Sequence, residues 1–163
     1  MTIRSTPIRF SALVVTFALA APVCRAQQTA EPKAASGVVA LLEKSGYNYS
    51  KVTNGVWEIL FTGKNVKEFP VRLALGEGIL VIISKLADRK GIDLQPPLLT
   101  KLMELNHSVD TVKFALSEDM LYARIDARLR TLDLEELKYS LDQISGATDE
   151  VYPQIKQYLA GAK

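Results

Sequence analysis

The sequence predicts a single α+β domain, in which helices cover one face of a mostly antiparallel sheet of five to six strands. Three patterns predict this class. Apolar residues recur at helical spacing in three segments, apolar and polar residues alternate in several segments between them, and turn residues separate the alternating segments. The expected order of elements is α-β-β-β(-β)-α-β-β-α.

The first 26 residues form a predicted secretory signal peptide. Arg4 and Arg9 precede an uncharged apolar run at 10–23, and a small-x-small ending closes at Ala26, after which we expect cleavage. The apolar run is too short to cross a bilayer, which needs roughly 20 helical residues. We therefore expect a periplasmic or secreted protein without a permanent membrane anchor.

Removal of the leader changes the charge and the cysteine content. The leader holds Arg4, Arg9 and Arg25, so 17 of the 20 basic residues remain against 18 acidic residues, a formal charge of −1. A near-neutral chain without a dense basic run lacks the charge that binding to nucleic acid requires. Cys24, the single cysteine, is lost as well, so the mature chain can form neither a disulfide nor a cysteine metal site.

The first predicted helix follows a short lead-in. Residues 27–35 are small and polar, which indicates a flexible N-terminal segment ahead of one folded domain at 36–163. Ser36 is a suitable N-cap, and Gly46 is placed to end the helix in a left-handed conformation. The apolar stripe of this short helix needs a partner to pack against.

The hydrophobic period then changes to two. Asn54-Gly55 favours a hairpin that joins a strand starting at Tyr47 to a strand at 56–62. A third alternating segment at 69–75 leads through a glycine turn into residues 79–83. This last segment is apolar on both faces. It is therefore either a central strand crossed on both sides by helices or loops, or a strand whose second side is covered by a partner.

The second half of the chain repeats these patterns. After a polar stretch at 85–93, Pro96-Pro97 suits a helix start, and that helix is expected to end near His107. A second hairpin joins residues 112–116 to 121–128, and its returning strand has one apolar and one polar side.

A long amphipathic helix closes the chain. Asp133 is its expected N-cap, and Glu136 three residues later resembles a capping box. Gly146 and Pro153 interrupt the stripe, since glycine costs about 1 kcal/mol and interior proline about 3 kcal/mol relative to alanine. We expect a bent helix or two consecutive helices.

Two sets of residues are candidates for an interaction surface. One is the outer side of the strand that is apolar on both faces, and the other is the polar side of the returning strand in the second hairpin. Together these candidates are Ile79, Val81, Ile83, Tyr122, Arg124, Asp126 and Arg128.

The residues do not favour an enzyme. His107 is the only histidine, so a multi-histidine metal site cannot be built within one chain. The carboxylate pair at 118–119 falls in a predicted turn, and the pair at 135–136 falls in the first turn of a helix, where acidic residues stabilise the helix dipole. We expect no catalytic residue, no cofactor and no metal.

Several tracts resemble the YbjN-domain family, which is related to the type III secretion chaperones. They are LTKLMELN (99–106), VKFALSEDMLYARID (112–126), LDLEEL (132–137) and YP (152–153). The likeness runs from about Val38 to Leu159. It implies the same α+β fold, frequent homodimers and a protein-binding role, but it supplies no catalytic residue. The export signal and the lack of strong acidity differ from the secretion chaperones.

Two functions from different classes follow from these observations. The first is an exported, non-enzymatic interaction module, homodimeric or bound to another protein or peptide. The second is a carrier of a small molecule or lipid in the cell envelope, which needs a void between helices and sheet lined by residues such as Trp57, Phe114 and Tyr122.

Overall fold

A computed structural model describes residues 27–159, which form one six-stranded antiparallel sheet and three α-helices and confirm the predicted fold class. The strand order is β1-β2-β3-β4-β6-β5. The predicted leader at 1–26 lies outside the described residues, as do residues 160–163. The elements are α1 (Gln27–Ser45), β1 (Tyr49–Thr53), β2 (Val56–Phe61), β3 (Phe69–Leu75), β4 (Ile79–Asp88), η1 (Arg89–Gly91), α2 (Pro96–Ser108), β5 (Lys113–Leu116), β6 (Met120–Arg128), α3 (Leu134–Ile155) and η2 (Lys156–Tyr158).

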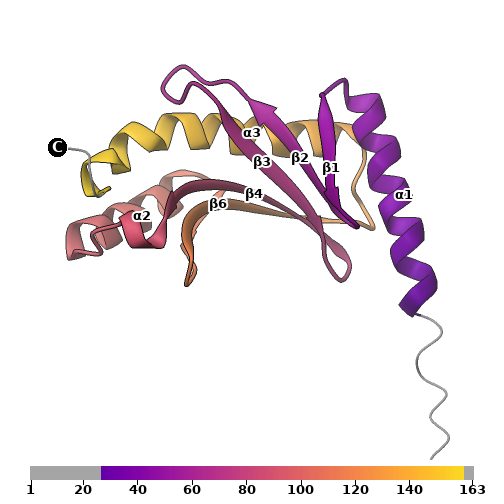
Figure 1. Cartoon of the computed structure of the whole chain (residues 1–163), viewed down its shortest axis with the longest axis horizontal. Helices are drawn as coiled ribbons and strands as arrows, with labels where there is room; N and C mark the ends of the chain where they lie inside the picture. Colours follow the sequence, from indigo (N-terminus) through magenta and orange to yellow (C-terminus); the bar gives the residue numbers. More distant parts are fainter. Residues whose placement is uncertain (1–26, 160–163) are drawn as a thin grey trace, which may run out of the picture.

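The helices differ in how they meet the sheet. Helix α3 packs on β3, β4 and β6, while α1 packs on α3 at one end of the molecule and α2 contacts β5 at the other (Figure 1). The three helices lie on one face of the sheet, and we call that face the inner face (Figure 1). Between residues 27 and 159, each helix is too short or too polar to cross a membrane.

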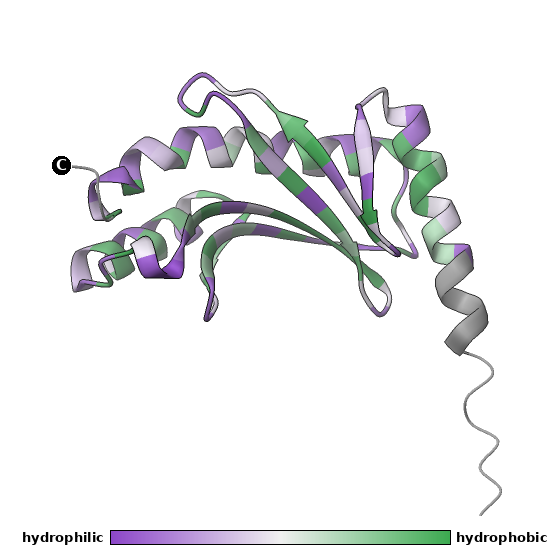
Figure 2. Cartoon of the chain, viewed as in Figure 1, coloured by the Kyte–Doolittle hydropathy of each residue, from purple (hydrophilic) through white to green (hydrophobic). Residues whose placement is uncertain are grey.

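The inner face supplies most of the core. Alternation along the strands brings Leu80 and Ile82 of β4 to 0% exposure, and α3 covers them with Leu137, Leu141 and Ile144, which are also fully buried. Figure 2 shows apolar and hydrophilic positions alternating along the strands. Burial of such an aliphatic side chain contributes about 1.5–3 kcal/mol.

Two predicted turns are confirmed by backbone geometry. Gly46 follows the last residue of α1 at φ +84°, and Gly55 lies in the β1–β2 hairpin at φ +71°. Both conformations are left-handed, a region that side chains other than glycine rarely adopt. These two residues set where α1 ends and where the sheet begins.

The closing helix differs from its prediction. Asp133 accepts a hydrogen bond from the Glu136 N–H at 2.8 Å, as an N-cap should, but α3 then runs unbroken from Leu134 to Ile155. Gly146 is exposed, and the cost of a glycine there is smaller than the gain from the buried residues on either side. Pro153 lies in the last turn, where it removes little of the helix.

Helix α1 begins earlier than predicted. The flexible segment expected at 27–35 is helical, and Ser36 lies inside α1 rather than at its N-cap. Alanine, glutamine, glutamate and lysine make up most of that segment, and these residues favour helix strongly enough to offset Pro32.

Strand β4 is longer than predicted. Residues 85–88, expected to begin a polar loop, continue the strand and pair with β6 as far as Asp88 opposite Met120. Leu86 continues the buried side of the strand at 7% exposure, and the register with β6 shifts between Lys85 and Ala87. Pairing with the long strand β6 therefore extends β4 into residues that are polar in sequence.

A carboxylate on α3 holds the β2–β3 loop. Asp149 accepts hydrogen bonds from the backbone N–H groups of Lys64, Asn65 and Val66 at 2.7–2.9 Å. Desolvation raises the pKa of Asp149, but these hydrogen bonds outweigh it and hold the pKa below its ordinary value. A Cβ on Gly63 would lie 2.2 Å from Asp149 Oδ1, so the contact requires glycine there.

A side chain also holds the edge strand β5. The Asn106 amide on α2 accepts from the Phe114 N–H at 2.6 Å and donates to the Phe114 carbonyl at 2.9 Å. This pair of bonds imitates one step of strand pairing, so α2 is fixed to the edge of the sheet and the backbone groups of Phe114 are occupied.

Candidate interaction surface

The strand register brings the seven predicted interaction residues together. In the β4–β6 pair, Ile79 lies opposite Arg128, Val81 opposite Asp126 and Ile83 opposite Arg124. Tyr122 lies opposite Lys85, the next outward residue along β4. All seven therefore share the face of the sheet that points away from α3, which we call the open face.

The open face is far less covered than the inner face. Ile79, Val81 and Ile83 are half-buried, whereas their neighbours Leu80 and Ile82 are completely buried under α3. Strand β4 is central, as predicted, but within residues 27–159 no helix or loop crosses its outer side in the way that one alternative required.

The apolar centre of the open face continues onto neighbouring strands. Val56 of β2, Ala74 of β3 and Val81 of β4 lie in one cross-strand row, and all three are half-buried. Leu60 of β2 extends this side and is 57% exposed. The sequence did not single out these flanking residues, because their position beside Val81 depends on strand register.

Charged side chains surround the apolar centre. Arg72 contacts Glu58 across β3 and β2 at 2.8 Å, and Arg124 contacts Asp126 on β6 at the same distance. The hydrogen bond to Asp126 raises the pKa of Arg124 above its ordinary value. Arg128 has no carboxylate partner within the described part of the chain. The open face therefore combines half-exposed aliphatic side chains with an accessible cation.

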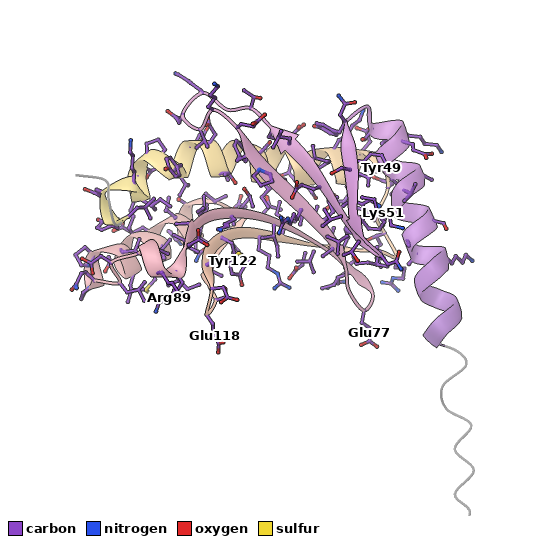
Figure 3. All side chains as sticks on the ribbon, viewed as in Figure 1. Tyr49, Lys51, Glu77, Arg89, Glu118 and Tyr122 are labelled. Atoms are coloured by element: carbon purple, nitrogen blue, oxygen red, sulfur yellow. The ribbon has the colours of Figure 1, made fainter. Side chains whose placement is uncertain are left out.

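The acid–base candidates lie apart from one another. His107 is exposed in the last turn of α2, and the carboxylates at 118–119 lie in the β5–β6 turn. Figure 3 shows Glu118 at the tip of that turn, directed away from the sheet. Glu135 and Glu136 are exposed in the first turn of α3, as expected for residues that complement the helix dipole.

The void expected for a carrier does not form around the three residues proposed for it. Trp57 and Phe114 are buried on the inner face at 2% and 4% exposure, but β2 and β5 are four strand spacings apart, about 19 Å. Tyr122 lies on the open face. A different groove, between α1 and the β1–β2 hairpin, does reach Trp57.

Solved structures resemble this chain at low sequence identity. YbjN from E. coli aligns with a TM-score of 0.55 at 15% identity, covering 76% of this chain and 93% of its own. A chain of the HopA1–SchA chaperone–effector complex aligns at 0.51 and 16% identity, covering 78% of this chain and 97% of its own. A chain of the ExoU–SpcU complex from the Pseudomonas aeruginosa type III secretion system aligns at 0.48 and 16%, covering 74% and 95%.

No protein-family model matches the sequence, and the search of curated proteins finds no match. The likeness to YbjN and to the chaperone–effector complex, which the residue tracts predicted, is thus confirmed at the level of the fold.

Proposed function

We propose that this chain, which shares its fold with YbjN and with a chain of a chaperone–effector complex, is an exported, non-enzymatic module that binds another protein through its open face. One observation carries the proposal. Ile79, Val81 and Ile83 remain only partly buried at the centre of the sheet, beside charged residues on the adjoining strand.

Covering the open face would be favourable. Full burial of one large aliphatic side chain contributes about 1.5–3 kcal/mol, and most of each of these side chains is already buried, so covering the remainder contributes less than about 1 kcal/mol per residue on binding. The surrounding Arg72, Arg124 and Arg128 would then select among partners, because charges at the rim of an interface act mainly on specificity and association rate.

The dispersed acid–base groups support a non-enzymatic role. His107, the single histidine, is at the end of α2, whereas the carboxylate pairs lie in a turn and at the start of α3. General acid–base catalysis needs such groups within hydrogen-bond reach of one substrate.

Export rests on the pattern at residues 1–26. The protein isolated from the envelope or medium should begin at Gln27, which intact-mass measurement would detect. A product that retains Met1, or one found only in the cytoplasm, would overturn this part of the proposal.

Site-specific photo-crosslinking tests the binding face. A photoreactive residue at Val81 should yield a protein adduct in cells, whereas the same residue at Tyr139, which is 49% exposed on α3, should not. The substitution Val81→Lys should abolish co-purification of the cross-linked partner, and Tyr139→Lys should leave it unchanged.

Each other result has a definite meaning. Adducts at Tyr139 alone, or at neither position, would refute binding at the open face. An adduct of twice the chain's mass, together with a dimer in light scattering, would identify the partner as a second copy, as the family resemblance implies.

A further inference from the structure

A groove of about 660 Å³ lies between α1 and the β1–β2 hairpin. Small-molecule sites in proteins are clefts of about 300–1,000 Å³, so the groove has the size of a ligand site. It is lined on the helix side by Ala35, Ser36, Val39, Ala40 and Glu43, and on the sheet side by Lys51, Asn54, Gly55, Trp57 and Leu75.

The sequence of α1 explains why the groove stays open. Val38 and Leu42 anchor the helix in the core at 1% and 0% exposure. The neighbouring positions that line the groove include Ala35 and Ala40, whose side chains are single methyl groups. The helix therefore leaves an open groove beside Trp57, whose own side chain is 2% exposed.

Two unpaired charges of opposite sign line this groove. Glu43 belongs to α1 and Lys51 to β1, and both are exposed. Within residues 27–159 neither takes part in a salt bridge. Figure 3 shows Lys51 on the strand beside α1. Because Glu43 and Lys51 form no salt bridge with each other, both charged groups remain available to a ligand in the groove.

We propose that the groove binds a single-chain amphiphile with a zwitterionic headgroup, of the lysophospholipid type. The chain packs on Val39, Leu75 and the small part of Trp57 that borders the groove, the phosphate meets Lys51, and the ammonium meets Glu43. A purely anionic headgroup would face the Glu43 carboxylate unpaired, and a neutral one would leave both charges without a partner.

This site is separate from the open face. Lys51 lies opposite Trp57 in the β1–β2 pair, so both belong to the inner side of the sheet. The proposal consequently does not depend on the protein-binding role.

Trp57 provides the readout, because it is the only tryptophan in the chain. The purified protein is titrated with lysophosphatidylethanolamine below its micellar concentration, and Trp57 emission is followed. Lysophosphatidylglycerol and dodecyl maltoside serve as anionic and neutral comparators. A saturable change is expected. The zwitterion should bind up to about fivefold more tightly than the anionic comparator, which lacks one solvent-exposed ion pair, and more tightly still than the neutral comparator, which lacks both.

Variants locate the site. Lys51→Glu should weaken binding of the zwitterion at least fivefold, and the exchange Glu43→Lys with Lys51→Glu should restore it. Lys67→Glu, at an exposed position of the β2–β3 loop, is the matched control and should change nothing. Ala40→Phe, also at an exposed position, should fill the groove and remove the saturable signal while circular dichroism stays unchanged.

Three outcomes would overturn the proposal. They are an unchanged Trp57 emission with all three amphiphiles, equal affinity for the three, and equal affinity of the Lys51→Glu and Lys67→Glu variants for lysophosphatidylethanolamine.

Discussion

The amide of Asn106 should make a measurable contribution to stability. It forms two hydrogen bonds with the backbone of Phe114, and Asn106→Ala removes both. At about 1 kcal/mol per net hydrogen bond, the free energy of unfolding should fall by about 2 kcal/mol. For a domain of this size the midpoint of thermal unfolding should fall by about 7 °C.

Urea denaturation followed by circular dichroism would measure this loss. Asn48→Ala is the matched control, because the Asn48 side chain is exposed and its change should stay within about 0.5 kcal/mol. A loss for Asn106→Ala no larger than that of the control would refute the reasoning, since water would then replace both bonds at no cost.

Four further predictions concern buried or tightly held polar groups. The Ser140 hydroxyl is buried without a hydrogen-bond partner among residues 27–159, so Ser140→Ala should stabilise the protein by about 1 kcal/mol in urea titration, and a loss of stability would contradict this. Gly63→Ala should destabilise the protein, because the added Cβ would meet the Asp149 carboxylate. A double-mutant cycle should show a smaller loss of stability when Asp149→Ala is also present, and purely additive effects would rule out this steric contact. The folded state lowers the pKa of Asp149. The contribution of the ionised carboxylate to the free energy of unfolding should therefore be complete above the pKa of the unfolded chain and disappear as pH falls through the folded-state pKa. Asp149→Ala should remove this part of the acid dependence of stability. Desolvation and a hydrogen bond to Asp142 raise the pKa of Tyr47 to about 12. The contribution of Tyr47 to the free energy of unfolding should therefore be complete below the unfolded pKa near 10 and be lost as pH rises to about 12. Tyr47→Phe should reduce this alkaline loss of stability, and an unchanged dependence of stability on pH would count against the hydrogen bond.

Local patterns predicted what is encoded by local sequence. The hairpin at Asn54-Gly55, the end of α1 at Gly46 and the cap at Asp133 each depend on a few adjacent residues, and all three were found as predicted. The shared face of Val81 and Asp126 also followed from period two within each strand, once β4 and β6 paired.

Features that depend on distant pairs were not predicted. Asp149 bonds to the backbone of Lys64, which is 85 residues away in sequence, and no local sequence pattern predicts such a contact. The extension of β4 to Asp88 required the partner strand β6, and the groove beside Trp57 required the placement of α1. Local sequence could not predict these three features, because each depends on how separate elements pack against one another.

The hydrogen bonds of Asn106 also limit how copies of this protein can associate. Polymers that grow by strand pairing need two free edges on every copy. On the β5 side, Asn106 already occupies the backbone of Phe114, near the middle of a strand of four residues. Within residues 27–159 the β1 edge is therefore the more open one, which favours pairing of two copies over growth into a fibre.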